Sequence, residues 1–593
     1  MEPIKVDFTG GSGAGKGKGS GKDAYLSPSK AGLKTVISII GTVIGAAIAY
    51  YFMLPPLNFK STELYLFLGI VALIYLALQV VLSGVIKKPE YTQYVKKQAI
   101  VPFVIIGVLA AVVAVGFVVS SVVFRASSYS KIIDVDENKT FSSDIKQADF
   151  QSVPVLDNDA SVALATRTLG DLASINKESQ FEVAQRFTQI NYKNSPVRVG
   201  TLAYGDVFKW LKNTKEGMPG YIIVDMVTQK TEFVMLKEGE YIRYSTEEHF
   251  SKYLMRHVRF AYPTYIFDEP HFEIDESGRP FWLCPVLDKT IGLFGGTDVK
   301  GVVIVDAITG ECNEYSLDTI KNDKSFQWID GIYSNNLLVE QYNYYGKYAG
   351  GFINSIIGQE GVRVATEGSN FLALNDDVYM YTGVTSVSND QAIIGFVLVN
   401  MRTKEANFYT ISGAKEYSAM DSAEGQVQNY KWTATFPILL NISGQPTYFM
   451  SLKDDANLVK CYAMVNVQNY QVVAIGDKIS ECTENYVKLL AQRNINIKVD
   501  IDKIKDDTDN ISNTDSNNPT EDETVSVKGV VEEIRTAVMG GESYYFIKLE
   551  GKKPYFKVAA SQHEAVVILN VGDSAAFTYK KDAAGSVIEA DMK

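Results

Sequence analysis

Cysteine and histidine are both scarce, with four of each among 593 residues. The cysteines are Cys284, Cys312, Cys461 and Cys482, and they form no Cys-x-x-Cys pair and no zinc-finger spacing with histidine. This absence excludes the common structural zinc motifs. We expect buried or free thiols. The alternative, for a chain segment outside the cytoplasm, is two local disulfides, Cys284–Cys312 and Cys461–Cys482.

Signatures of catalysis are missing as well. The chain has no G-x-S-x-G, no H-E-x-x-H and no cysteine–histidine signature. His249 and His257 are separated by about 12 Å of rise if they share a helix, too far to hold one metal ion directly. His271 with Glu273 offers a metal pair, and His563 stands alone. We predict structural histidines, no metal, no cofactor and no enzyme.

Arginine is absent from residues 1–124, where eleven lysines and five acids give a net charge of +6. The whole chain carries −12, so residues 125–593 carry −18. A surface that acidic repels phosphate backbones, which argues against nucleic acid as a partner.

Asp, Glu, Lys, Arg and His are also absent from three long apolar runs, Thr35–Leu54, Leu64–Ile86 and Ala99–Phe124. Each is long enough to cross about 30 Å of hydrocarbon as a helix, and none has the polar face of a soluble helix. Without an acid, a base or a histidine inside the spans, a proton or ion pathway has no side chains to use. The sequence therefore predicts a three-helix membrane anchor in a lipid bilayer, not a transporter.

The lysines predict how the anchor is oriented. Five precede the first span between Lys16 and Lys34, and four lie between the second and third spans, whereas the first loop has only Lys60. The positive-inside rule places the N-terminus in the cytoplasm and everything after Phe124 outside. The glycine-rich tail matches a phosphate-binding loop as far as Lys16, but Gly17 replaces the Ser or Thr that would hold Mg²⁺, so we predict a flexible basic tail.

The first part of the outer region has two expected elements. Residues 125–170 are polar and irregular, which predicts a stalk. Lys177–Gln189 has apolar residues at helical spacing, so we predict a helix there, followed by strands.

After residue 170 the chain repeats itself. Residues 220–233 (GYIIVDMVTQKTEF) align without gaps with residues 395–408 (GFVLVNMRTKEANF). Two further matches are 277–280 (SGRP) with 443–446 (SGQP) and 302–306 (VVIVD) with 462–466 (YAMVN). Three landmarks in the same order predict a tandem duplication.

Within each copy, an apolar strand ends in Val-Asp or Val-Asn, at Asp225, Asp306, Asn400 and Asn466. Side chains of Asp and Asn cap hairpins, and Gly310 suits a turn position with positive φ. We therefore interpret these acids as turn residues rather than catalytic groups.

The stretch Val305–Glu311 (VDAITGE) resembles the hairpin of PepSY-type domains, extracytoplasmic modules often found beside proteases and cell-wall proteins. The runs TIGLFGGTDV (290–299), DDVYMYTGVTSV (376–387) and NISGQPTYFM (441–450) resemble a largely uncharacterised family of membrane-anchored extracytoplasmic proteins of Gram-positive bacteria. That resemblance spans most of residues 150–485 and implies no known activity or catalytic residue.

Aromatic residues are concentrated between the two copies. Trp328–Tyr345 has partial helical spacing, which Gly346, Gly350 and Gly351 would end. Such a face binds sugars or peptides, or it packs in a core where two repeats meet. The candidate ligand-binding residues in this segment are Trp328, Tyr342, Tyr344, Tyr345 and Tyr348.

The C-terminal part begins with an acidic, apolar-poor segment at 498–523, which predicts a disordered linker. From residue 524 on, five short strand patterns, with a short helix around Ser561–Val567, suit a small OB-like barrel. Tyr545 and Tyr555 are its candidate ligand-binding residues.

The predicted fold is three N-terminal transmembrane helices, a duplicated β-rich α+β region and a small C-terminal β-barrel. The expected segments are 1–34 (tail), 35–124 (anchor), 125–170 (stalk), 171–354 and 355–497 (repeats), 498–523 (linker) and 524–593 (barrel). The predicted function is a membrane-anchored extracytoplasmic binding or scaffold protein of the cell envelope, with an envelope protein or cell-wall glycan as partner. The alternative is a cell-wall or peptide hydrolase that uses His257 or His271 with nearby acids.

Overall fold

The structure is a computed structural model that describes residues 26–141, 145–148, 150, 153–170, 179–374, 377–387, 392–493, 495, 524–539, 542–560, 566–567, 569–580 and 587–592. The chain divides into two compact units, residues 1–512 and 513–593. The division falls in the predicted linker 498–523, which lies outside the described residues, as does most of the predicted basic tail.

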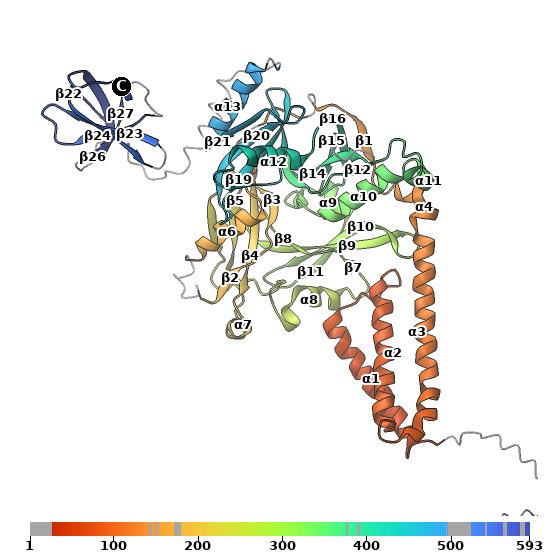
Figure 1. The fold of residues 1–593 in the computed structure, drawn as a ribbon. Helices are drawn as coiled ribbons and strands as arrows, with labels where there is room; N and C mark the ends of the chain where they lie inside the picture. Colours follow the sequence, from red (N-terminus) through yellow and green to blue (C-terminus); the bar gives the residue numbers. More distant parts are fainter. Residues whose placement is uncertain are drawn as a thin grey trace, which may run out of the picture. The chain divides into compact units, whose positions relative to one another are not determined.

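Three apolar helices, here called the anchor, open the first unit (Figure 1). They are α1 (Ala31–Met53), α2 (Thr62–Ser83) and α3 (Thr92–Ser120), and a 3-10 turn at Pro89–Tyr91 precedes α3. All three are long and apolar enough to span a membrane, which confirms that part of the prediction.

Two glycines bring α1 and α2 close together. A Cβ at Gly41 would lie 2.9 Å from a methyl carbon of Leu78, and one at Gly45 would lie 3.0 Å from Ile74. Small residues at such crossings let helix backbones approach in a bilayer. Gly69 and Gly107 have no neighbouring atom within 4 Å of a Cβ, so they have no such role.

The rest of the first unit, here called the body, consists of curled sheets and the helices that cover them (Figure 1). Its first half has two sheets. The strands of the first sheet are β2 (Phe181–Val183), β3 (Thr188–Tyr192), β4 (Ser195–Tyr204), β5 (Gly220–Asp225) and β6 (Thr231–Met235). Those of the second are β7 (Ile266–Phe267), β8 (His271–Ile274), β9 (Pro280–Ile291), β10 (Gly295–Asp306) and β11 (Cys312–Ser316).

The second half of the body also has two sheets. The third sheet contains β12 (Arg363–Ala365), β13 (Asn370–Leu374), β14 (Asp377–Ser386), β15 (Ala392–Asn400) and β16 (Ala406–Ala414). The fourth contains β17 (Thr433–Ala434), β18 (Ile438–Ile442), β19 (Gln445–Lys453), β20 (Val459–Asn466) and β21 (Val473–Gly476). In each of the four sheets, two short strands pair with the third strand, which pairs with the fourth, which pairs with the fifth.

Helices connect and cover the sheets (Figure 1). They are α4 (Val122–Tyr129), α6 (Asn158–Thr168), α7 (Val207–Asn213), α8 (Leu254–Ala261), α9 (Leu317–Asn322), α10 (Asn335–Tyr348), α11 (Gly351–Ile356), α12 (Glu416–Gln426) and α13 (Ile479–Gln492), with 3-10 turns at Phe250–Lys252 and Lys324–Phe326. Several begin at a side-chain cap, as where Asp157 accepts the N–H of Ala160 at 2.9 Å in α6.

Buried apolar side chains join the sheets into one body. One cluster draws on the first, second and fourth sheets, a second on the second and third sheets, and another on the third and fourth. Each sheet therefore shares a core with its neighbours, and burial of this apolar area is the main stabilising contribution.

The turn residues predicted from the repeat are confirmed. The carboxylate of Asp225 accepts the N–H groups of Val227 and Thr228 at 2.9 and 2.8 Å. Asp306 makes the same pair of bonds in the second sheet and Asn400 in the third, and Asn466 accepts the N–H of Asn469 in the fourth. Gly310 has φ +79°, as expected.

The equivalents of Gly310 in the first and third sheets are Gln229 and Lys404, which adopt φ +61° and +63°. This conformation is costly for residues with a Cβ. Their side chains make contacts between the halves that a glycine would lose. Gln229 donates to the hydroxyl of Tyr462 at 2.8 Å, and Lys404 pairs with Asp298 at 2.7 Å.

The predicted helix at Lys177–Gln189 is wrong over its described residues. Phe181–Val183 and Thr188–Tyr192 are strands β2 and β3. Phe187 lies over β4 where a Cβ on Gly200 would come 2.6 Å from its ring, so this packing, and not the local spacing, decides the conformation.

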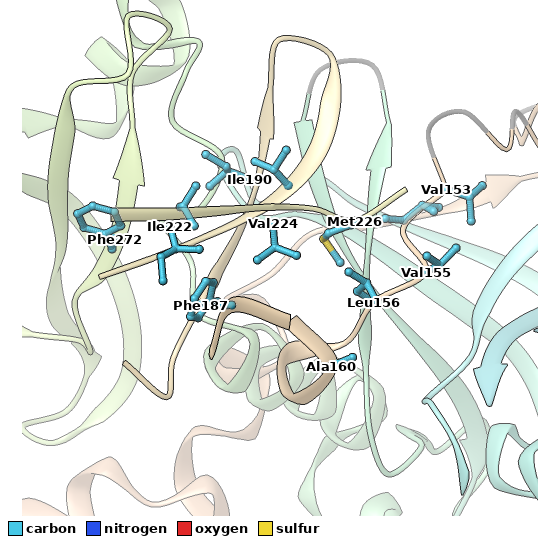
Figure 2. Close-up of a cluster of buried hydrophobic side chains, with 14 of the residues drawn as sticks. Val153, Val155, Leu156, Ala160, Phe187, Ile190, Ile222, Val224, Met226 and Phe272 are labelled. Atoms are coloured by element: carbon cyan, nitrogen blue, oxygen red, sulfur yellow. The ribbon is translucent and has the colours of Figure 1, made fainter. Parts of the chain in front are cut away.

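The segment expected to be a stalk is folded into the body instead. β1 (Val135–Lys139) pairs in parallel with β16, although the two are far apart in sequence. Val153, Val155 and Leu156 are buried and point into the cluster that contains Val224 of β5 (Figure 2). A polar five-residue edge strand has no sequence pattern that distinguishes it from an irregular segment.

Two arginines of α8 join the body to the end of α1. Arg256 donates to the carbonyl oxygen of Tyr51 and Arg259 to that of Leu54, both at 3.0 Å. The last carbonyls of a helix lack partners within the helix, so these bonds complete the C-terminus of α1. Burial lowers the pKa of Arg259.

The other two helices of the anchor are also attached. The hydroxyl of Ser120, at the end of α3, accepts the N–H groups of Leu293 and Phe294, both at 2.9 Å, from the turn between β9 and β10. In the loop before α2, Lys60 pairs with Asp288 at 2.9 Å. These contacts and the arginine bonds, here called the junction, fix the body to all three helices.

The second unit is a curled six-stranded sheet. Its strands are β22 (Thr524–Met539), β23 (Glu542–Leu549), β24 (Tyr555–Ala559), β25 (Ser574–Lys580), β26 (Val587–Glu589) and β27 (Asp591–Met592). One part of β22 pairs with β25 and the other with β23. The outermost strands, β26 and β27, are consecutive along the chain. The helix predicted around Ser561–Val567 lies mostly outside the described residues.

Candidate functional site

A groove runs along the exposed face of α10. Its volume is about 500 Å³. One wall is formed by α10, and the other by the loop between β12 and β13. The lining residues are Asn335, Asn336, Val339, Glu340, Asn343, Tyr344, Lys347, Tyr348, Thr366, Gly368 and Ser369. The groove thus combines two aromatic rings with amides, one acid and one base.

The two tyrosines give the groove its apolar surface. The rings of Tyr344 and Tyr348 lie 6.1 Å apart at an interplanar angle of 27°. Tyr344 donates its hydroxyl hydrogen to Glu340 at 2.7 Å. Burial and this bond raise the pKa of Tyr344, so its hydroxyl stays a neutral donor at physiological pH.

The groove is connected to the anchor through one aromatic contact. The ring of Tyr129, in α4, lies 4.6 Å from that of Tyr344. The hydroxyl of Tyr129 donates to the carbonyl oxygen of Ser120 at 2.6 Å. Because Ser120 is the last residue of α3, the groove has a fixed position relative to the anchor.

The other three candidates from this aromatic segment lie elsewhere. Tyr342 is fully buried in the core, where its ring packs with apolar side chains. Trp328 packs against Phe281, with ring centres 5.1 Å apart. Tyr345 donates to Glu137, which also pairs with Arg363. The structure therefore divides the predicted set between a core and a groove.

Tyr545 and Tyr555, in the second unit, are not brought together. Tyr545 lies on the core face of β23 with the buried Ile547, and it packs against the core. Tyr555 is the cross-strand partner of Lys548, whose side chain lies on the face of β23 opposite that of Tyr545. The Tyr555 hydroxyl donates to Glu533. Hence these two tyrosines do not form one binding face.

The histidines have backbone or aromatic partners. His257 bonds to the carbonyl oxygen of Gly310 at 2.7 Å, and His271 bonds to that of Gly331 and lies 3.2 Å from Glu273. His249 packs against Trp210 with ring centres 4.9 Å apart. His563 lies outside the described residues. In the described ranges no three His, Cys, Asp or Glu side chains form a metal-binding group.

All four cysteines are free thiols, and three of them are buried. Burial raises the pKa of Cys312 and Cys461 to about 11. Raised values keep thiols protonated and unreactive near neutral pH, which is the behaviour of structural cysteines.

The sequence did not indicate the second wall of the groove. Thr366, Gly368 and Ser369 lie in a polar turn with no unusual pattern, and only the packing of β12 against α10 places them opposite the tyrosines.

The chain matches no family model, no curated protein and no solved structure.

Proposed function

We propose that this chain is a membrane-anchored, extracytoplasmic binding protein of the bacterial cell envelope, without catalysis, and that the α10 groove holds its ligand. A strand of cell-wall glycan is the favoured ligand and an envelope protein the second choice. The observation that carries the proposal is the groove itself, which is open, contains two tyrosine rings and is fixed relative to the anchor through Tyr129.

The chemistry of the groove suits a sugar chain. Tyrosine rings offer large apolar faces with a polar end, and Tyr344 and Tyr348 lie nearly parallel. Asn335, Asn336 and Asn343 supply amide donors and acceptors beside them. Ligand sites commonly combine an apolar surface with a few polar groups that fix orientation.

The orientation of the proposed anchor rests on its lysines. The connection between α2 and α3 lies at the end of these helices away from the body (Figure 1). In the sequence, Lys87 and Lys88 belong to this connection and Lys96 and Lys97 to the start of α3, where the positive-inside rule expects the cytoplasm. The body and the second unit are then on the outer side, where a wall glycan is available.

We also infer that the two halves of the body are a tandem duplication with PepSY-like hairpins, and that the second unit is an OB-like barrel. The shared strand order and the turns at Asp225, Asp306, Asn400 and Asn466 support the duplication. The parallel pairing of β24 with β26 and the pairing of β22 with both β23 and β25 support the barrel.

Co-sedimentation with purified, protein-free cell-wall glycan tests the proposal. The full chain is used in detergent, with Tyr348→Ala and Asn336→Ala as groove variants. Each loses contacts at the ligand but none in the core, so we expect roughly tenfold weaker binding, equivalent to about 1.4 kcal/mol. Tyr470→Ala is the matched control, since Tyr470 is 48% exposed and does not line the groove.

Equal binding by wild type and both groove variants would contradict the assignment of the groove. If the glycan does not bind at all, chemical cross-linking in membranes tests whether the ligand is an envelope protein. A protein captured by wild type and the control, but not by Tyr348→Ala, makes an envelope protein the ligand.

A further inference from the structure

Helix α7 is an insertion that the second and fourth sheets lack. It lies between β4 and β5, whereas the corresponding strands of the second and fourth sheets are joined by short turns at 292–294 and 454–458. Trp210 and Asn213 face the body and are buried. Val207, Phe208 and Leu211 on the opposite face are 50%, 72% and 54% exposed.

An apolar pocket of about 410 Å³ lies between α7, the segment before α8 and the end of α1. Its lining residues are Tyr51, Phe52, Val207, Thr246, Glu248, His249, Phe250, Tyr253 and Arg256. Tyr51 and Phe52 belong to an apolar helix that is long enough to span a membrane, so the pocket is continuous with the surface of that helix. In Figure 1, α7 projects from the body on the side of the anchor.

Phe250 is held in an unusual conformation at this pocket. Its φ is +51°, which is strained for an aromatic residue, and its side chain is 58% exposed. The ring of Phe250 lies 5.6 Å from that of Trp210, and more than half of the side chain remains exposed beside this contact. Together with α7, it forms an apolar surface that nothing in the chain covers among the described residues.

The pocket also has a cation. In the described part of the chain, the guanidinium of Arg256 bonds to the backbone carbonyls of Tyr51 and Phe250 and to no carboxylate, and it stacks on the ring of Tyr51. The two carboxylate oxygens of Glu248 accept hydrogen bonds from the Tyr204 hydroxyl at 2.5 Å and from the indole N–H of Trp210 at 2.8 Å. The carboxylate is therefore bonded to donors from β4 and α7. Around α7, the exposed Lys212 and Lys215 stand beside the exposed acids Asp206 and Glu216.

We propose that α7 and this pocket bind a glycerophospholipid of the leaflet on the body's side. The phosphate lies near Arg256, one acyl chain follows α1 past Phe52, and Val207, Phe208 and Leu211 enter the headgroup boundary. Apolar side chains flanked by lysines are typical of helices that lie in the membrane interface. The inference rests on the membrane anchor of the proposed function but not on the α10 groove.

Quenching by brominated acyl chains tests the position of α7. The full chain is reconstituted in phosphatidylglycerol nanodiscs as Phe208→Trp or, as control, Tyr430→Trp. Tyr430 is 66% exposed and follows α12, which Figure 1 shows on the side of the body away from α1. We expect brominated lipid to lower the added emission of Phe208→Trp about twofold, because the interface is within reach of the bromines, and to leave that of Tyr430→Trp unchanged.

Equal quenching of the two variants would overturn the proposal. Failure of the chain to enter nanodiscs would instead overturn the membrane anchor, so the two failures are distinguishable.

Native mass spectrometry of the full chain tests the pocket. We expect wild type to retain one phosphatidylglycerol, and Val207→Trp, which fills the pocket from an exposed position, to lower that occupancy about tenfold. Retention that does not change in Val207→Trp, or a second copy of the chain bound in place of lipid, would contradict the lipid site.

Discussion

The two halves of the body have the same strand order but differ where their third and fourth strands connect. In the first half, these connections carry α7 and the turn that places Phe294 against α3. In the second half, the connection between β19 and β20 is a short turn at 454–458. The first half thus attaches the body to the anchor helices. The second half, with the same strand order, supplies one wall of the groove through the loop between β12 and β13.

This difference separates the residues that attach the body to the anchor from those that line the proposed binding groove. The contacts to the end of α1 and to Ser120 come from α8 and the β9–β10 turn. The groove lies between α10, which links the halves, and the second half. Four sets of substitutions and one thiol measurement test this comparison, beginning with the junction.

Gly116→Leu should have the largest effect. A Cβ at Gly116 would lie 2.2 Å from the ring of Phe294, so a leucine pushes the β9–β10 turn off α3. We expect a loss of about 3 kcal/mol of stability, measured by thermal unfolding of the full chain in nanodiscs. Gly107→Leu is the control, because no atom lies within 4 Å of its Cβ position. Similar losses in both variants would contradict a specific contact at Phe294.

Arg259→Ala should destabilise the junction by about 2 kcal/mol, because the carbonyl oxygens of Leu54 and Tyr265 lose a donor. Arg186→Ala is its control. That residue pairs with Glu269, but both side chains are largely exposed, at 80% and 72%, so a change below about 0.5 kcal/mol is expected. Denaturant titration followed by tryptophan fluorescence measures both. An Arg259→Ala variant as stable as wild type would remove the arginine from the junction.

Lys404→Met should weaken the contact between the halves by about 1–2 kcal/mol, because it leaves the partly buried Asp298 without its cation. Asp298→Asn tests the pair in a double-mutant cycle. We expect the double variant to lose less than the sum of the single losses. Additive losses would show that the strained Lys404 is not retained for this ion pair.

Asp225→Asn should be nearly neutral, because Asn400 makes the same turn in the second half. Asp225→Ala removes the acceptor and should cost about 1 kcal/mol. Chemical denaturation of the two variants side by side provides the measurement. If Asn were as damaging as Ala at this position, the turns of the two halves would not be equivalent.

The cysteines should behave alike in the two halves. We expect four free thiols per chain under denaturing, non-reducing conditions. In the folded chain, alkylation of Cys312 and Cys461 should be slow at pH 8 and should accelerate as the pH rises toward 11, because their raised pKa keeps the thiolate fraction small. A count of two thiols would instead indicate a disulfide in one half.

Local patterns predicted the features that depend on local physics. The three apolar runs predicted the helices of the anchor because length and hydropathy alone determine that a helix suits a membrane. Asp306 and Gly310 predicted their turn because the side-chain bonds and the positive φ belong to a few consecutive residues.

Features that depend on distant partners were not predictable. β1 is a strand because β16 offers it an edge. α10 continues through Gly346, the first of the three glycines expected to end it, and ends at Tyr348, before Gly350. Gly346 allows the helix to approach β12, since a Cβ there would lie 2.4 Å from the carbonyl oxygen of Arg363. The candidate tyrosines divided for the same reason. Tyr342 and Tyr344 are two residues apart on one helix, and only the tertiary packing decides which of them is buried.

Protease treatment of intact protoplasts tests the proposed function most directly, because a wall-binding body must be outside the membrane. Two epitope tags, one before Met1 and one after Lys593, report the two ends of the chain. The proposed function predicts that the C-terminal tag is removed from intact protoplasts, whereas the N-terminal tag is lost only after lysis. A C-terminal tag that stays protected until lysis would place the groove in the cytoplasm and contradict the proposal.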